Sequence, residues 1–529
     1  MKDGFKIIDL FAGPGGLGEG FSAYKDSCGQ HPFKIALSIE KEESAHRTLQ
    51  LRSFYRQFPE GEVPDVYYRY LAGEFGKLPD ELYKDSTVRK EARLAAEEAR
   101  QFTLGEHNRA INTAIEAALG KNKGPWVLIG GPPCQAYSLV GRSRNMGIEG
   151  YDAEKDHRSF LYREYLKVIA KFRPTIFVME NVKGMLSAKV GGRSIFEDIR
   201  RDLQCPAKAL RSSDWPQEYV IYSLAIESEQ STSDLFDKSL DPHDFVLKAE
   251  NYGVPQARHR VILLGIKSDV ASLVNPGILE EKPAPNIRDV IDDLPALRSG
   301  LSKSQDSWEN WLSSINTGLD KVVESVKVGG NEEVAELMLK VASKMKKKKL
   351  DRGSNWAQPQ QVPITRGLPR NLRNWYLDPQ GRREIYNHDT RGHMSSDLHR
   401  YLFSACFSII DPNGSGLAPK AAQFPRILAP NHANWKSGHF IDRFRVQLAN
   451  KVATTVTSHI SKDGHYFIHY DPAQCRSLTV REAARIQTFP DNYFFVGNRT
   501  QQYVQVGNAV PPYLANQIAE VVADIASVL

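Results

Sequence analysis

The stretch Lys6–Gly20, KIIDLFAGPGGLGEG, decides the fold of this chain. An apolar run leads into a glycine-rich turn, and the residues after the turn suit a helix. Gly13, Gly15 and Gly18 have the spacing G-x-G-x-x-G, and Glu40 lies 22 residues beyond Gly18, at the end of the next apolar run. Glycines at such a turn let the backbone bend tightly and approach a ligand closely. The pattern predicts the strand–turn–helix unit that opens a doubly wound α/β fold.

The first 270 residues continue this alternation of short apolar runs and amphipathic helices. Candidate strands are Lys6–Phe11, Lys34–Glu40, Trp126–Ile129, Thr175–Glu180, Tyr219–Ile226 and Arg260–Ile266. Continuous apolar runs are expected for strands that are buried on both faces of a parallel sheet. Strands that alternate with helices at this spacing predict an α/β, Rossmann-like doubly wound domain.

The length of 529 residues exceeds that of one ordinary compact domain. We predict a catalytic and cofactor-binding domain over residues 1–268, with a helical insertion at about 74–122. The loop-rich stretch 269–470, with its proline joints and one amphipathic helix, is predicted to form a second, smaller domain. Residues 471–529 are predicted to return to the first domain.

The amino-acid composition limits the classes of protein to which this chain can belong. Hydrophobic residues make up 41% and charged residues 25%, which is typical of a globular protein, and the net charge of +6 permits a nucleic-acid partner. The five cysteines, at 28, 134, 205, 406 and 475, include no C-x-x-C pair, so no disulfide framework and no metal site are expected. The sequence shows neither a signal-peptide pattern nor the roughly 18 apolar residues of a membrane span, which favours an intracellular protein.

A reactive thiol is suggested by Gly130–Gln135, GGPPCQ, which follows the apolar run WVLI. Pro132 and Pro133 restrict the backbone just before Cys134. An open α/β sheet presents ligands beyond the carboxyl ends of its strands, which is where Cys134 falls. A thiolate there could act as a nucleophile. The alternative is a small buried cysteine.

An acid and two arginines are expected at the same edge. Glu180 ends the apolar run IFVM, and a partly desolvated carboxyl group can hold or donate a proton. Gln256, Arg258 and Arg260 alternate before the run VILLG, so a regular strand would direct all three to one face. The alternative for the acid and the arginines is a set of structural ion pairs. The glycine loop alone fits a nicotinamide dehydrogenase as well as a methyltransferase, or a turn without a ligand.

Taken together, these segments resemble the DNA (cytosine-5) methyltransferase family of bacterial restriction-modification type. DLFAGPGG resembles its cofactor loop, GGPPCQAYS its catalytic loop, ENV its acidic motif and QARHR its arginine motif. RSLTVREAARIQTFP, from Arg476 to Pro490, and GNAVPP, from Gly507 to Pro512, resemble the two closing motifs. All six occur in the order of the family, with a variable region between the fourth and the fifth. The dehydrogenase alternative leaves most of these motifs without a role.

The resemblance implies a reaction and a cofactor. Cys134 would add to carbon 6 of a flipped-out cytosine, Glu180 would hold or protonate ring nitrogen 3, and Arg258 would help to fix the base. The methyl donor would be S-adenosyl-L-methionine. By similarity it would contact Phe11, Ala12, Gly13, Gly15, Gly16, Glu40, Pro133 and Asn508. The family also has an acidic residue after its third strand, near the adenine, for which Asp65 is the candidate.

The resemblance also implies the partner. Residues 269–470 would read double-stranded DNA, and the glycine- and arginine-containing segment 138–152 would close over it. Candidate phosphate or guanine contacts are Arg366, Arg370, Arg373, Arg391, Lys436, Arg443 and Arg445. The lysines of 344–349 fit either a solvated helix end or phosphate contacts. We expect a monomer on DNA, in the bacterial cytoplasm with the nucleoid, paired with a restriction endonuclease. A tRNA cytosine-5 methyltransferase and a catalytically silent DNA-binding relative remain as alternatives.

Overall fold

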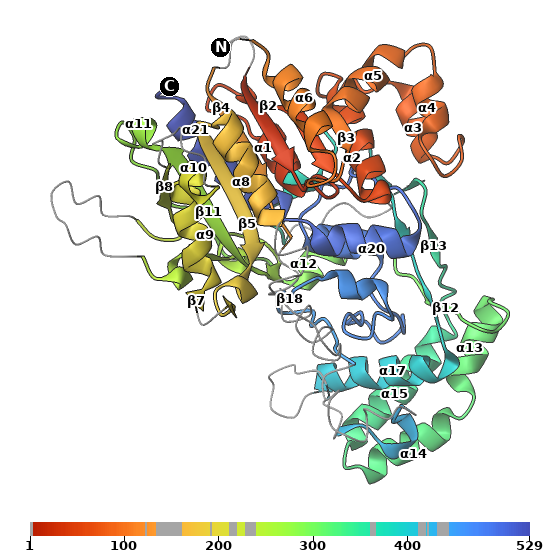
Figure 1. Cartoon of the computed structure of the whole chain (residues 1–529). Coiled ribbons are helices and arrows are strands. Elements are labelled where there is room, and N and C mark those ends of the chain that lie inside the picture. The colour runs from red at the N-terminus through yellow and green to blue at the C-terminus, as the bar shows by residue number, and fades with distance from the viewer. Residues whose placement is uncertain are drawn as a thin grey trace. The chain divides into compact units, whose positions relative to one another are not determined.

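The computed structural model describes residues 4–121, 124–133, 161–190, 193–210, 219–227, 240–359, 367–410, 419, 423–430 and 444–529. The chain divides into two compact units (Figure 1). The first unit consists of residues 1–63, 79–283 and 509–529, and the second consists of 64–78 and 284–508. In the described ranges, no helix combines the length and the apolar composition needed to cross a membrane.

The first unit is built on one eight-stranded sheet. Its strands are β1 (Phe5–Leu10), β2 (Phe33–Glu40), β3 (Ala99–Gln101), β4 (Trp126–Gly130), β5 (Ile176–Val182), β8 (Tyr219–Tyr222), β9 (Val246–Lys248) and β11 (His259–Lys267). The order across the sheet is β3-β2-β1-β4-β5-β11-β8, and β9 also pairs with β11. The strands from β3 to β5 are parallel, and β11 runs antiparallel to β5, β8 and β9.

The predicted Rossmann-like α/β fold is confirmed. Each of the six predicted strands is present, with ends that differ by a few residues. β3 and β9 were not predicted, because a run such as Ala-Arg-Gln has no apolar pattern. The predicted helical insertion at 74–122 therefore contains an edge strand of the sheet as well as the helices α4 (Asp80–Lys84), α5 (Arg89–Glu98) and α6 (Asn108–Leu119).

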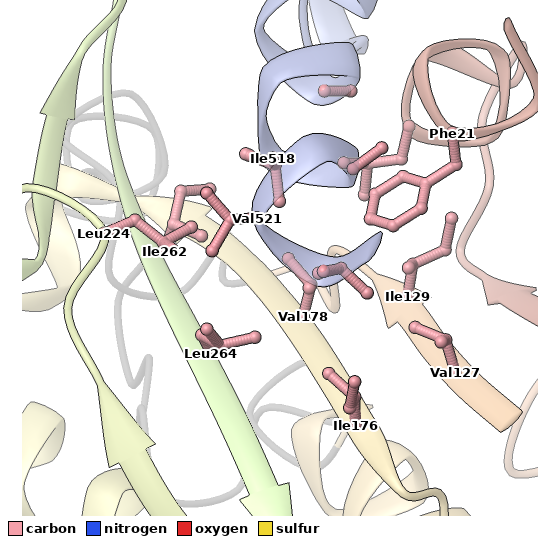
Figure 2. Close-up of a cluster of buried hydrophobic side chains, with 14 of the residues drawn as sticks. Phe21, Val127, Ile129, Ile176, Val178, Leu224, Ile262, Leu264, Ile518 and Val521 are labelled. Atoms are coloured by element: carbon pink, nitrogen blue, oxygen red, sulfur yellow. The ribbon is translucent and has the colours of Figure 1, made fainter. Parts of the chain in front are cut away.

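Both faces of the sheet are buried, which explains the continuous apolar runs of its strands. Successive residues point to opposite faces. Ile7 of β1 joins the cluster on one face, and Ile8 joins the cluster on the other. Figure 2 shows the first face, where Ile518 and Val521 of α21 (Pro512–Ala526) lie over the strands. The same face is covered by α1 (Gly16–Ala23), and the opposite face by α6, α8 (Leu161–Phe172) and α9 (Ile195–Gln204).

The second unit combines helices and long loops with short two-stranded pairings, such as β12 (Gly300–Leu301) with β17 (Gly392–His393) and β13 (Gly353–Ser354) with β16 (His388–Asp389). Its helices are α3 (Asp65–Leu71), α12 (Ile287–Ile291), α13 (Trp308–Asn316), α14 (Leu319–Val328), α15 (Glu332–Met345), α16 (Arg370–Tyr376), α17 (Ser395–Ile410), α19 (Val480–Ile486) and α20 (Arg499–Asn508). The segment 64–78 belongs here because the Leu71 carbonyl accepts a hydrogen bond from the Ala357 amide at 2.9 Å and Tyr70 packs edge-on against Trp356 and Phe494.

Residues 471–508, predicted to return to the first domain, group with the second unit. The physical reason is a set of buried arginines in and before α19. Arg476 makes two hydrogen bonds to Glu482, at 2.7 and 2.6 Å. Arg485 lies between Asp293 and Asp491, and its side chain has no exposed surface. Burial opposes its charge, but the two carboxylates raise the pKa of Arg485 above its ordinary value. The Glu482 and Asp491 pairs lie within the segment, whereas the Arg485–Asp293 pair and a hydrogen bond from the Arg476 Nε to the Leu297 carbonyl, at 3.2 Å, join it to the rest of the second unit.

Candidate active site

The strand order creates a switch point between β1 and β4. The chain proceeds from β1 toward β2 and β3 on one side, and later to β4 and β5 on the other. In open α/β sheets a crevice forms at the carboxyl ends of the strands on either side of such a point. β1 leads into the glycine loop and β4 into the GGPPC segment. The topology therefore brings the two predicted site loops to one edge of the sheet.

The glycine loop has the conformation that its residues predict. Gly13 has φ +58° and Gly15 has φ +100°, both in the left-handed region that favours glycine. A side chain built on Gly13 would meet no atom of the described residues within 4 Å, so the loop is open on that side. Phe11 also has a positive φ, +58°, which is uncommon for a non-glycine residue. The backbone at this loop is therefore accessible for a ligand.

Glu40 ties the end of β2 to this loop. Its Oε2 accepts a hydrogen bond from the Gly13 amide at 2.8 Å, and its Oε1 accepts one from the Glu42 amide at 2.7 Å. Burial raises the pKa of Glu40. A carboxylate has about four acceptor positions, so Glu40 keeps capacity for the hydroxyl groups of a ribose.

These features fit the predicted cofactor. Phe11, Ala12, Gly13, Gly15 and Gly16 surround the carboxyl end of β1, next to Glu40 at the end of β2. Pro133 follows β4 and is half-buried. Asn508 is the last residue of α20, in the second unit, and is exposed. The individual contacts of all eight residues with S-adenosylmethionine remain predictions.

Asp65 is wrong as the acid after the third strand. It is the first residue of α3 in the second unit, its side chain is 77% exposed, and its carboxylate lies 3.6 Å from Arg382. The strand next to β2 is β3, which ends at Gln101 and is followed by Phe102. The Phe102 amide donates a hydrogen bond to the Glu40 carbonyl at 3.1 Å. Neither of these two residues carries a carboxylate.

The predicted acid lies beside the exit of β4. A side chain built on Gly131 would come within 2.9 Å of the Glu180 Oε2 atom, so the carboxylate lies directly over this glycine. The neighbouring Asn181 is buried, and its Nδ2 atom donates a hydrogen bond to the Pro132 carbonyl at 3.2 Å. Two successive residues of β5 thus contact the segment that leads to Cys134.

The arginine beside Glu180 is Arg260. Its Nε lies 2.7 Å from the Glu180 Oε1, and both side chains are about 15% exposed. Arg258 is 1% exposed, and burial, followed by the charge of Arg260, lowers its pKa well below the ordinary value. The regular alternation predicted from the sequence breaks at Arg258, which lies between β10 (Gln256–Ala257) and β11. The catalytic role predicted for Arg258 remains a prediction.

Several predicted residues cannot be placed. Cys134, the segment 138–152, Arg366, Lys436 and Arg443 lie outside the described residues.

Among the other candidate DNA contacts, Arg370 and Arg373 lie on α16, the first exposed and the second half-buried. Arg391 donates to the carbonyl oxygens of Ile460, at 2.7 Å, and Lys462, at 3.1 Å, which is a structural role. Arg445 is half-buried. The lysines of 344–349 are all exposed, at the end of α15 and just beyond it.

Sequence reasoning missed two parts of the site. Asn181 could have been found, because it directly follows the predicted acid Glu180 near the end of an apolar run, where a buried amide requires hydrogen-bond partners. The contact of Arg260 with Glu180 accompanies a break in the strand at Arg258, which period-two alternation does not reveal.

We expect Gly131→Ala to lower the turnover number about tenfold or more, because the new methyl group must displace the Glu180 carboxylate and small misplacements of reacting groups are costly. Affinity for S-adenosylhomocysteine should stay within twofold, as measured by calorimetry. Gly277→Ala is the matched control, since a side chain built there meets nothing within 4 Å. An unchanged turnover number in Gly131→Ala would show that the close contact between the Glu180 carboxylate and Gly131 does not matter for the reaction.

Comparisons with known proteins identify the family. A family model for C-5 cytosine-specific DNA methylases matches residues 106–205 and 241–524, more than half of the chain. Type II methyltransferase M.Bpa9945I of Bacillus paralicheniformis is 32% identical over 536 residues, which cover 98% of each chain. Type II methyltransferase M.AgeI of Thalassovita gelatinovora is 25% identical and covers 98% of this chain and 99% of its own.

Similarity to a solved structure supports the fold alone. A crystal structure described as a prophage-encoded DNA modification methyltransferase (E. coli) has a TM-score of 0.50 at 17% identity, and covers 99% of both chains. The match of the family model and the full-length similarity to M.Bpa9945I establish the relationship. This chain belongs to the C-5 cytosine-specific DNA methylase family and is a DNA cytosine-5 methyltransferase.

Proposed function

We propose that this enzyme transfers a methyl group from S-adenosylmethionine to carbon 5 of a cytosine in a specific double-stranded DNA sequence. By this means it protects the DNA of a bacterial host from a cognate restriction endonuclease. The relatives named as type II methyltransferases support the pairing with an endonuclease. Location in the bacterial cytoplasm with the nucleoid is part of the same proposal. The predicted monomeric state on DNA is part of the same proposal.

The observation that carries the proposal is the arrangement at the carboxyl ends of β4 and β5. Glu180 lies over Gly131, three residues before Cys134, and Arg260 stands beside Glu180 at 2.7 Å. A carboxyl group and a guanidinium lie together at this sheet edge, and with a thiol they are the groups that activation of cytosine requires; the sequence supplies that thiol as Cys134, three residues after Gly131. The open glycine loop with Glu40 lies at the end of the neighbouring strands β1 and β2.

The chemistry follows from these groups. Carbon 5 of cytosine is a poor nucleophile, so the Cys134 sulfur forms a bond to carbon 6 while Glu180 holds or protonates nitrogen 3. Electron density then rises at carbon 5. We assign the part of fixing the base to Arg260 together with Arg258, because the Arg260 guanidinium contacts Glu180. The cofactor, when bound, would supply an electrophilic methyl group that bonds to carbon 5, with S-adenosylhomocysteine as the leaving group. Loss of the proton on carbon 5 and elimination of the Cys134 thiolate restore the aromatic ring.

Specific DNA recognition is assigned to the second unit and to the segment 138–152. The target base must leave the duplex, because its ring atoms are inaccessible within the stack, and this costs a few kcal/mol. Residues 269–470 are proposed to supply the contacts that repay this cost and select the site. Arg370 is exposed and is therefore a candidate for a phosphate contact.

Bisulfite sequencing tests the proposal. A bacterial host without cytosine methylation carries either the wild-type gene or an empty vector. We expect unconverted cytosines in one recurrent short motif of the genomic DNA from the first culture alone. Complete conversion in both cultures, with folded and abundant protein, would contradict the DNA substrate. The same analysis of total tRNA from these cultures then decides whether the enzyme modifies RNA instead.

A further inference from the structure

We propose that Asn181 is a positioning residue for methyl transfer, which sets the direction in which the chain leaves β4 toward Cys134. This inference rests on the proposed function for the role of Cys134. The contact that carries it is a single buried hydrogen bond, in which the Asn181 Nδ2 donates to the Pro132 carbonyl at 3.2 Å.

The register of the sheet explains why a side chain is needed there. β4 and β5 are parallel, and their last paired residues are Gly130 and Met179. Pro132 and Asn181 each lie two residues beyond this pair. Proline has no amide proton, so the backbone ladder cannot continue regularly through the two prolines. Beyond the last paired residues, the Asn181 side chain supplies a donor from β5 that holds the Pro132 carbonyl.

The two prolines make this one bond effective. Their rings fix φ near −65°, so the path toward Cys134 depends mainly on the ψ angles of Pro132 and Pro133. Rotation about ψ of Pro132 turns its carbonyl, and the hydrogen bond from Asn181 selects one orientation. The peptide bonds from Gly131 to Pro133 are trans, since no cis peptide bond is present among the described residues.

Asn181 is itself held firmly. It is 3% exposed, and its Oδ1 accepts a hydrogen bond from the Val182 amide at 2.8 Å. Its backbone is paired in β5 with Val261 of β11. The amide group therefore has a defined orientation, with the donor directed at Pro132. The adjacent Glu180 lies over Gly131, so two consecutive residues of β5 fix consecutive residues of the exit from β4.

Asn181→Asp provides the sharpest test, because it preserves shape and the acceptor but replaces the donor by a second oxygen. We expect the turnover number of Asn181→Asp and Asn181→Ala to fall about 10- to 100-fold. KM for S-adenosylmethionine and affinity for S-adenosylhomocysteine should stay within twofold. Hydrogen exchange of the peptide that ends β4 should become faster in both variants.

Gln517→Ala is the matched control. Gln517 is also a buried amide of the first unit, and its Nε2 donates to the Tyr252 carbonyl at 2.9 Å, far from β4 in the sequence. Gln517→Ala should lower the free energy of unfolding about as much as Asn181→Ala does and should leave the turnover number unchanged. The inference would be overturned if Asn181→Asp had the turnover number of the wild type. It would also be overturned if its turnover number and its affinity for S-adenosylhomocysteine fell by the same factor.

The two proposals fail in different ways. If the wild type methylates no DNA, the proposed function is refuted. The exchange measurement does not depend on turnover, so it still decides whether Asn181 holds the exit of β4. Unchanged exchange in both Asn181 variants would refute the positioning contact even in a fully active enzyme.

Discussion

Replacement of Cys134 by alanine is expected to lower the rate of methyl transfer at least about 10³-fold, since nucleophile deletions in covalent mechanisms cost this much or more. Without the bond from sulfur to carbon 6, carbon 5 of cytosine stays unreactive. The predicted cofactor contacts, most of which lie in the glycine loop and at Glu40, do not include Cys134 and are unchanged in the variant. Affinity for S-adenosylhomocysteine should therefore remain within twofold of the wild-type value.

Purified protein, a DNA fragment with the recurrent motif and labelled cofactor give the rate, and calorimetry gives the affinity. Cys28→Ala is the matched control, because Cys28 is an exposed free cysteine of the same unit. It should keep the wild-type rate. A residual rate of Cys134→Ala within tenfold of the wild type would show that the reaction does not pass through this thiol.

The second large effect concerns stability. Arg485→Ala should lower the free energy of unfolding of the second unit by about 3–5 kcal/mol, because the charges of Asp293 and Asp491 would remain buried without their partner. Arg485 also donates to the Val290 carbonyl at 2.9 Å, so the substitution removes a hydrogen bond to α12 as well. Urea unfolding followed by tryptophan fluorescence measures the change.

The matched control is Arg69→Ala in the same unit. Arg69 pairs with Glu74 at 2.8 Å, but both side chains are 48% exposed, and exposed pairs contribute between about 0 and 1 kcal/mol. If the Arg485 and Arg69 variants unfold at similar urea concentrations, the buried cluster does not stabilise the unit as described. Neutralising Asp293 and Asp491 in the Arg485 variant should recover part of the loss, since no unpaired buried charge then remains.

Much of the fold could be predicted from the sequence because its strands are buried on both faces. Runs such as Trp126–Ile129 are apolar without interruption and are followed directly by glycines and prolines, so their short length favours a buried strand over a helix. β3 could not be predicted, since its three residues, Ala99–Gln101, pair only with the end of β2. An edge strand of this length has too few positions for any periodicity to appear.

Site residues could be predicted where a motif directly follows a strand. They could not be predicted where their position depends on packing against residues far away in the sequence. Gly13 and Glu40 come directly after β1 and at the end of β2, and the structure joins them by a hydrogen bond. Asp65 was misassigned because its segment packs with residues about 290 positions later, through contacts such as Tyr70 with Trp356. No local pattern in 64–78 shows that the chain leaves the first unit there.

Helix α21 has a consequence for biosynthesis. It covers one face of the sheet, where Ile518 and Val521 lie over strands made hundreds of residues earlier (Figure 2). During translation the ribosome completes β1, β4, β5 and β11 long before it reaches residue 512. The nascent chain therefore carries an apolar sheet face that α1 covers only in part while residues 284–508 of the second unit are synthesised, and exposed apolar surfaces are prone to aggregation. Chaperone binding should persist until α21 leaves the ribosome. An mRNA truncated before codon 512 should yield a protein that is degraded.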